Sequence, residues 1–177
     1  MARICRIDAS SRYDRHVGEF RFRDAGIDDC RLIFEWANDP ETRANSAATE
    51  PIEWDGHVEW FERKLVDPNA EIWIVESGEG LPLGQVRFDL RGDEAEIGVM
   101  VAAEHRGGGL GTQVIERATR ELITQHPGLA VIAHVRHHNV ASQRAFVKAG
   151  YEPDGEGDAR GVTMLRFVRR SRKGDSR

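Results

Sequence analysis

The sequence predicts an α+β protein with three layers, in which a mixed, mostly antiparallel sheet is flanked by helices. Strand-like segments follow one another between residues 71 and 101, with short glycine-containing turns between them. A glycine-rich loop and an amphipathic helix then lead into one further buried strand, as in a parallel crossover. The expected order, β-α-α-β-β-β-α-β-α-β-β, is neither that of a doubly wound sheet nor that of a barrel.

The first half of the chain is expected to supply an edge of the sheet and two helices. Residues 1–18 are polar and weakly patterned, which predicts a loose extension or an added edge strand. Asp28 and Asp29 can cap the first helix. That helix should end near residues 38–40, because the residue before a proline avoids the helical region. The remaining elements are a strand over 20–23, a loop over 41–51 and a helix over 54–65.

The second half is expected to complete the sheet. Gly98 indicates either a bulge that separates neighbouring strands or a closely packed strand position. Asn139 should cap a short helix that ends at Gly150, since asparagine is a good N-cap and glycine favours the position after a helix. The other expected elements are strands near 71–75, 83–90 and 94–101, a helix ending near 125, and strands over 129–135 and 162–168.

Length and composition are those of one globular domain. The 177 residues suffice for one core, expected over 19–169 and followed by a basic tail at 170–177. The net charge of −5 gives no indication of nucleic-acid binding. No apolar run approaches the roughly 18–20 residues of a membrane span, and the N-terminus has no signal-peptide core. Two cysteines are too few for a disulfide framework, so we expect a cytoplasmic protein.

The most informative motif is Arg106-Gly107-Gly108-Gly109-Leu110-Gly111-Thr112, which lies between a buried strand and a helix. Glycines let consecutive N–H groups point into one concavity, and a helix N-terminus adds about half a positive charge. The expected ligand is a phosphate or pyrophosphate. A P-loop would need a lysine after the last glycine, and a dinucleotide-binding turn would need a third glycine in place of Thr112. A turn that only permits tight packing is the simpler alternative.

Two motifs together resemble the GNAT family of N-acetyltransferases. Arg106, Gly109 and Gly111 fit the Arg-x-x-Gly-x-Gly loop that binds the pyrophosphate of acetyl-CoA in that family. Further on, the segment from Asn139 to Tyr151 resembles the family pattern Asn-x-x-Ser/Ala-x-x-x-Tyr/Phe-x-x-x-Gly-Phe/Tyr. The resemblance covers residues 19–169. It implies the GNAT fold, acetyl-CoA as co-substrate, and direct acetyl transfer to a primary amine in a ternary complex.

The resemblance also implies where acetyl-CoA binds. In the family, the strand before the glycine loop binds the pantetheine amides through its backbone, and the start of the later helix lies beside the pantetheine arm. The expected acetyl-CoA-binding residues are Val99, Val101, Arg106, Gly107, Gly108, Gly109, Leu110, Gly111, Thr112, Asn139, Ser142 and Phe146. No metal is expected, because His134, His137 and His138 have no Cys or carboxylate at ligand spacing.

Acetyl transfer needs a neutral amine, so a proton acceptor is expected near the acetyl group. Glu96 is the first candidate, because it lies on the strand that enters the glycine loop; a solvated strand face is the alternative. His57 is a candidate base or substrate ligand, against a satisfied, partly buried histidine. Many GNAT enzymes have a tyrosine acid on the helix after Asn139, where this chain has Phe146. Ser142 or a water is therefore expected to act instead.

The N-terminal third is expected to bind the acceptor. Its pattern from Trp36 to Arg43, followed by His57, resembles bacterial nucleotide-sugar N-acetyltransferases, which acetylate a UDP-linked amino sugar. This implies that Arg43 pairs with a diphosphate and that Asn38 binds sugar hydroxyls. An arginine-lined pocket would favour this acceptor, and an acidic pocket would favour polyamines or aminoglycosides.

Two further alternatives stay open for the function. One is a protein N-terminal acetyltransferase of the ribosomal-protein type, and the other is an acyl-CoA-binding module without catalysis. The expected partner is a small-molecule amine acceptor, with no nucleic acid and no membrane. A homodimer is one possible assembly.

Overall fold

The computed structural model describes residues 19–171, so the expected extension over 1–18 and residues 172–177 of the expected tail lie outside the described residues. A seven-stranded sheet with the order β1-β2-β3-β4-β5-β7-β6 runs through this part. Within it, β4 and β5 pair in parallel and every other neighbouring pair is antiparallel. The strands are β1 (Phe20–Asp24), β2 (Ala70–Ser77), β3 (Pro82–Arg91), β4 (Glu94–Val101), β5 (Ala130–Val135), β6 (Glu152–Ala159) and β7 (Val162–Arg170).

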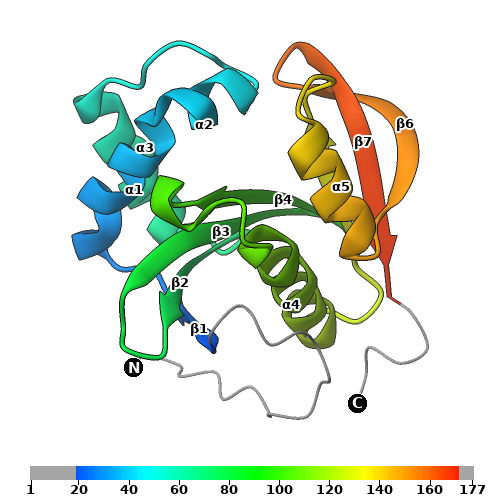
Figure 1. Ribbon diagram of the computed structural model, residues 1–177, viewed down its shortest axis with the longest axis horizontal. Coiled ribbons are helices and arrows are strands. Elements are labelled where there is room, and N and C mark those ends of the chain that lie inside the picture. Colours follow the sequence, from blue (N-terminus) through cyan, green and yellow to red (C-terminus); the bar gives the residue numbers. More distant parts are fainter. Residues whose placement is uncertain (1–18, 172–177) are drawn as a thin grey trace.

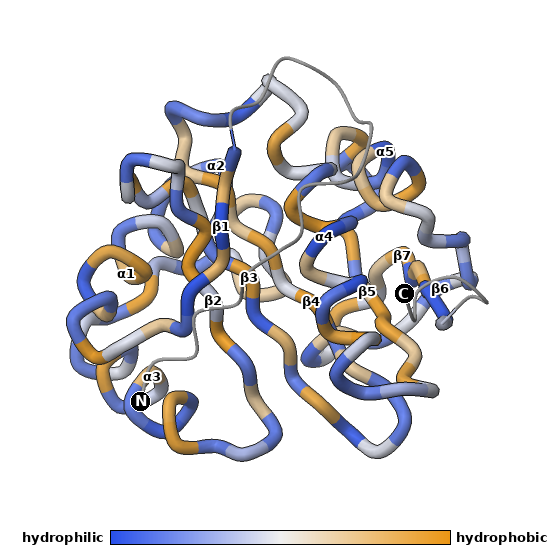
Figure 2. The backbone as a smooth tube through the Cα atoms, turned by 90° about the horizontal axis from the view of Figure 1, so that it is seen from below, coloured by the Kyte–Doolittle hydropathy of each residue, from blue (hydrophilic) through white to orange (hydrophobic). Residues whose placement is uncertain are grey.

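Helices cover both faces of the sheet, which confirms the expected α+β class (Figures 1 and 2). One core lies under α4, where Val114 and Leu122 are buried with Phe88 of β3. A smaller core on the other face joins Ile33 of α1 to Phe61 of α3. None of the helices described in residues 19–171 is long and apolar enough to cross a membrane. The helices are α1 (Cys30–Asn38), α2 (Pro40–Asn45), α3 (Trp54–Val66), α4 (Leu110–Gln125) and α5 (Val140–Lys148).

The expectation of a loop over 41–51 is wrong in its first part, because α2 occupies Pro40–Asn45. Its N-cap is Asp39, whose carboxylate accepts a hydrogen bond from the Thr42 N–H at 2.9 Å. Pro40 is at the first helical position, where its missing N–H costs nothing and its fixed φ suits the helix. None of the six residues of α2 is buried, so the helix has no apolar periodicity that the sequence could have shown.

Asp28 and Asp29 do not cap α1 as expected. Both lie in a short 3-10 turn, and the Asp29 side chain makes no capping hydrogen bond to α1. Its carboxylate instead accepts from the Gly26 N–H at 2.8 Å and from the Arg23 guanidinium at 2.6 and 2.7 Å. Asp29 therefore fixes the junction between β1 and α1 rather than the helix start.

The parallel pair β4–β5 is short, and this opens the sheet. The two strands pair only where Glu94 to Glu96 lies beside Ala130 to Ile132. Beyond that point, β4 stays paired with β3 as far as Val101, and β5 stays paired with β7. The β3–β4 register is regular at Gly98, so the bulge considered for this position is absent and the strands separate without it. One edge of β4 is consequently unpaired after Glu96.

The close approach of β3 and β4 depends on Gly84. A Cβ at this position would overlap the Met100 carbonyl oxygen of the neighbouring strand. We expect Gly84→Ala to lower the free energy of unfolding by about 2 kcal/mol, as overpacking does. Gly98→Ala is the matched control, because a Cβ there meets the flexible end of Arg87 at 3.6 Å. The free energy of unfolding of Gly98→Ala should be higher than that of wild type or lower by at most about 0.5 kcal/mol. Urea unfolding measures both, and equal losses would contradict the prediction.

Candidate active site

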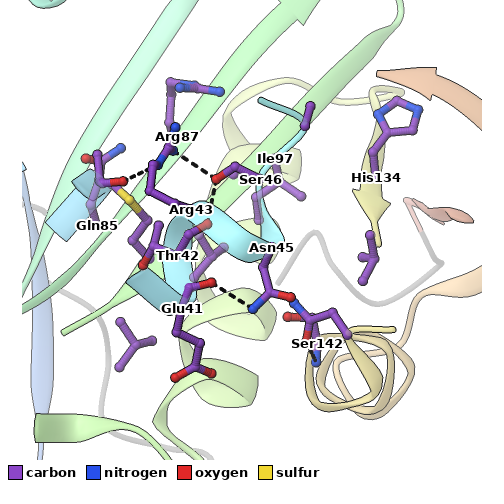
Figure 3. Close-up of a pocket in the computed structure, with 18 of the residues that line it drawn as sticks. Glu41, Thr42, Arg43, Asn45, Ser46, Gln85, Arg87, Ile97, His134 and Ser142 are labelled. Carbon is purple, nitrogen blue, oxygen red and sulfur yellow. Dashed lines mark hydrogen bonds between the residues drawn. The ribbon is translucent and has the colours of Figure 1, made fainter. Parts of the chain in front are cut away.

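A cavity of about 980 Å³ lies where β4 and β5 separate. Its walls come from α2 and the following segment on one side, and from the starts of α4 and α5 on the other (Figure 3). The turn between β6 and β7 adds Arg160. A volume of this size accommodates a large ligand and part of a second one. The cavity therefore unites the glycine-rich loop with the segment expected to bind an acceptor.

The glycine-rich loop has the backbone of an anion cradle. Gly107 and Gly109 have φ angles of 81° and 85°, in the left-handed region that favours glycine. The N–H groups of Gly107, Gly108 and Gly109 have no hydrogen-bond partner within residues 19–171. A Cβ at any of these three glycines would enter open space, and α4 begins at Leu110. Free N–H groups at a helix N-terminus fit the pyrophosphate of a coenzyme.

The Arg106 side chain is bound within the fold, and its expected contact with acetyl-CoA stays a prediction. Its Nε donates to the Val101 carbonyl at 3.0 Å. Its other nitrogens reach the carboxylates of Asp39 at 2.8 Å and Glu41 at 3.0 Å, both at the start of α2. The hydrogen bond from Arg106 holds the pKa of Asp39 below its ordinary value. Arg106 thus ties the glycine-rich loop to α2.

The start of α5 forms the opposite wall. Asn139 caps it as expected, with its side-chain oxygen accepting from the Ser142 N–H at 3.0 Å. Ser142 lines the cavity. Phe146 belongs to the core, because it is 6% exposed and packs edge-on against Tyr151 at 5.0 Å between ring centroids. It also lines the cavity. The Tyr151 hydroxyl is bound to Thr119 at 2.7 Å in the core, so it cannot replace the tyrosine acid.

Glu96 and His134 form a polar pair in the cavity wall, where β4 and β5 begin to separate. The Glu96 carboxylate lies 3.2 Å from Nδ1 of His134. This hydrogen bond holds the pKa of Glu96 below its ordinary value, although burial opposes it. The side chains are 29% and 10% exposed, so the pair is shielded but open to the cavity. Glu94, on the same strand face, lies instead 2.6 Å from Arg166.

Two residues expected to touch the substrate are bound within the fold, and His57 but not Asn38 lines the cavity. Both polar atoms of the Asn38 amide bind the backbone of Ile52, at 3.0 and 2.8 Å, and Asn38 does not line the cavity. Asn38 therefore holds the segment after α2 in place. His57 is 2% exposed, its Nε2 lies 3.1 Å from the Cys30 carbonyl, and burial lowers its pKa. Its ring stacks on Phe61, which favours a neutral structural histidine over a base.

Arg43 lines the cavity, but three of its N–H groups are already bound. They donate to the carbonyls of Ala37 and Ala48 and to the Ser46 hydroxyl. No carboxylate among residues 19–171 pairs with it, and its pKa is lowered by burial and by the nearby charge of Arg160. Arg43 therefore keeps an uncompensated positive charge with few free donors, and its expected pairing with a diphosphate stays a prediction.

Arg160 completes this positive region and was missed by the sequence reasoning. It lies in the turn between β6 and β7 with a φ of 57°, a conformation uncommon for a residue other than glycine. It lines the cavity and has no hydrogen-bond or ion-pair partner in the described part of the chain. The neighbouring Gly161 marks a turn in the sequence, but only the folded hairpin brings Arg160 toward Arg43. No cluster of three potential metal ligands occurs among residues 19–171.

Comparison with known proteins agrees with the family that the two sequence motifs resemble. The family model described as "Acetyltransferase (GNAT) domain" matches residues 19–152. The chain has no match among curated protein sequences.

Among solved structures, the chain is similar to the aminoglycoside acetyltransferase AAC(6')-Ib in complex with coenzyme A. The identity is 18%, covering 86% of this chain and 95% of that one, with a TM-score of 0.74. A spermidine N-acetyltransferase from Vibrio cholerae, in complex with CoA and spermine, is 20% identical over 85% and 95% of the chains, with a TM-score of 0.73. A domain from Methanocaldococcus jannaschii is 19% identical over 88% and 100%, with a TM-score of 0.76.

The Arg106 contacts can be tested by two substitutions. Arg106→Ala should weaken acetyl-CoA binding about tenfold, or about 1.4 kcal/mol, because the loop loses its ties to Val101 and α2. Asp39→Asn should also weaken it, since Arg106 loses one of its two charged partners. Lys148→Ala, which removes an exposed cation outside the cavity, is the control. Calorimetric titration with acetyl-CoA measures all three. Tighter binding by Asp39→Asn would instead show that Arg106 is free to contact phosphate.

Proposed function

We propose that the acceptor of this chain is the primary amine of a nucleotide-linked amino sugar. The chain belongs to the GNAT acetyltransferase family and is an acetyl-CoA-dependent N-acetyltransferase. The observation that carries the proposal is the pair Arg43 and Arg160. Both line the cavity, and neither has a carboxylate partner in the described residues. Their uncompensated charges favour an acceptor that carries an anion as well as an amine.

The charges around the cavity support this choice over a multiply charged amine. Its lining includes four arginines and three glutamates, namely Arg43, Arg87, Arg106, Arg160, Glu41, Glu50 and Glu96. Glu41 and Glu96 are already paired, with Arg106 and His134. A polycation would need a surplus of free carboxylates, whereas a diphosphate needs cationic donors. Arg160 has free donors, and Arg43 contributes mainly through its charge.

A cationic small amine is the second candidate. It is favoured by Glu50, which is exposed at the cavity and has no ion-pair partner within residues 19–171. Similar structures contain spermine or belong to an aminoglycoside acetyltransferase. Because these structures are at most 20% identical to the chain, their ligands do not determine its acceptor.

In the proposed reaction, Glu96 takes the proton of the acceptor ammonium directly or through water. A free alkyl amine has a pKa of about 10, so it needs help to present its lone pair at neutral pH. The lowered pKa of Glu96 keeps the carboxylate ionised at that pH, and His134 orients it. Backbone N–H groups at the unpaired edge of β4, near Val99, are suited to stabilise the oxyanion. Ser142 is suited to relay the proton that the attacking nitrogen loses to the departing thiolate, so that its own hydroxyl is restored.

In this proposal, acetyl-CoA binds to the elements that line the cavity. The N–H groups from Gly107 to Thr112 would hold the pyrophosphate, and the free edge of β4 around Val99 and Val101 would bind the pantetheine amides. Asn139 and Ser142 would border the pantetheine arm at the start of α5. The thioester would then lie between the two halves of the cavity, with the acceptor entering from the side of α2.

Glu96→Gln should lower kcat by about 10² to 10⁴-fold, because the proton acceptor is lost. Acetyl-CoA affinity should not change. Glu94→Gln, on the same strand face but bound to Arg166, is the matched control and should keep its kcat. Steady-state kinetics at pH 7 test both variants. Equal activity of the two variants would exclude Glu96 as the base.

The same variant gives a prediction for stability against pH. Because the folded-state pKa of Glu96 is below its ordinary value of 4.5, its ionised form stabilises the fold above that pH. The contribution is lost as the pH falls through the lowered pKa. Thermal unfolding should therefore show a lower Tm for Glu96→Gln at pH 7, and the difference should disappear in stronger acid. A difference that persists there would indicate a packing defect.

The acceptor is tested by incubating the protein and acetyl-CoA separately with a UDP-linked 4-amino sugar, spermidine, and peptides with free N-termini. Mass spectrometry should find the acetyl increment in the sugar. Arg160→Ala should raise KM for the sugar about tenfold with little change in kcat, since a charge-assisted contact is lost. Arg144→Ala, exposed on α5 outside the cavity, is the control. Product from spermidine or peptide alone would overturn the proposed acceptor.

A further inference from the structure

The Gln85 side chain is a buried polar group that the fold does not satisfy. Gln85 lies on β3, is 3% exposed and lines the cavity (Figure 3). Its Oε1 is buried and has no hydrogen-bond partner among the described residues. Buried polar atoms are nearly always paired, because an unpaired one keeps the cost of losing its water. An unpaired oxygen in a cavity wall is thus an observation that points to a ligand.

Strand alternation places Gln85 on the acceptor side of the sheet. Val86 and Phe88, which alternate with Gln85 and Arg87 along β3, face the core under α4. Gln85 and Arg87 face the opposite side, toward α1 and α3. Across the ladder, Gln85 pairs with Met100 of β4, which packs on the core of α1 and α3. The amide therefore lies on the face opposite α4, and next to the unpaired end of β4.

The neighbouring donors are engaged elsewhere. The Arg87 Nε donates to Asp89 at 2.9 Å, and its guanidinium lies 5.4 Å from the centroid of the Trp60 ring. Arg43 donates to Ala37, Ala48 and Ser46, as described above. Neither arginine donates to Gln85. Residues 19–171 thus supply no donor to Oε1, and a ligand in the cavity that carries an N–H or O–H group is suited to be its partner.

We propose that Gln85 is a specificity-determining residue, whose Oε1 accepts a hydrogen bond from a hydroxyl or N–H group of the acceptor beside the reacting amine. This inference rests on the proposed function. An amino sugar offers such a hydroxyl next to its amino group. A site that binds a hydroxyl discriminates strongly against the analogue that lacks it, because a buried polar group is then left unpaired. Gln85 would thereby select the acceptor without taking part in proton transfer.

The experiment compares wild type with Gln85→Met, which keeps the length of the side chain but removes the hydrogen-bonding atoms. The acceptors are a UDP-linked 4-amino sugar with a hydroxyl beside the amine and its analogue deoxygenated at that carbon. Wild type should prefer the hydroxylated sugar in kcat/KM by about 100-fold or more. Gln85→Met should lose at least about tenfold in kcat/KM for that sugar and keep little of the preference.

Two further measurements separate recognition from a structural defect. Acetyl-CoA affinity should not change in Gln85→Met. Its Tm without ligands should equal or exceed that of wild type, since an unsatisfied polar group has been removed. Gln125→Met, at an exposed position whose amide binds only Glu121 at 2.9 Å, is the control for the substitution itself.

An unchanged kcat/KM, an unchanged preference between the two sugars, or a lower Tm for Gln85→Met would each overturn the inference. If wild type acetylates spermidine and no sugar, the proposed acceptor is wrong. The role of Gln85 is then decided by the same kcat/KM comparison with spermidine, whose N–H groups can serve Oε1. Acetylation of no amine by wild type would remove both proposals.

Discussion

The site depends on one constraint, the early end of the pairing between β4 and β5. Only three residues of each strand pair, and each strand then follows its other neighbour. The separation leaves one edge of β4 without partners, and it creates the cavity into which the glycine-rich loop, α2 and α5 all project. A sheet with complete parallel pairing would satisfy this edge and would leave no space between the strands. The unpaired backbone is thus retained for a ligand.

The segment from Asp39 to Ala48 closes the cavity because it is held from two directions. Arg106 binds its beginning from the glycine-rich loop. Arg136, just after β5, donates to the carbonyls of Ser46 and Ala47 at 2.8 to 3.0 Å. No residue of this segment is buried, so these arginine contacts, and not apolar packing, fix its position. The charge of Arg106 is compensated by the carboxylates of Asp39 and Glu41, which distinguishes Arg106 from Arg160.

The sequence predicted the sheet, the core helices and the position of the glycine-rich loop, because apolar periodicity and glycine spacing are local signals. It did not predict α2, none of whose residues is buried. The expectation that Asp29 caps α1 was wrong. It also placed Asn38 and His57 at the substrate, although their polar atoms serve the backbone of Ile52 and Cys30. Residue type and position do not reveal which partner a side chain chooses. Arg160, His134 and Gln85 come together only through pairing of strands distant in the sequence.

Arg106 joins the part of the protein suited to the coenzyme to the wall suited to the acceptor. A ligand that shifts the loop also alters the contacts of Asp39 and Glu41, and a ligand that shifts α2 alters the loop. Binding equilibria linked in this way are reciprocal, so each ligand changes the affinity of the other by the same factor. The order in which the two substrates are met in solution leaves this coupling unchanged. A single guanidinium is thus the contact through which the two walls of the cavity would be coupled.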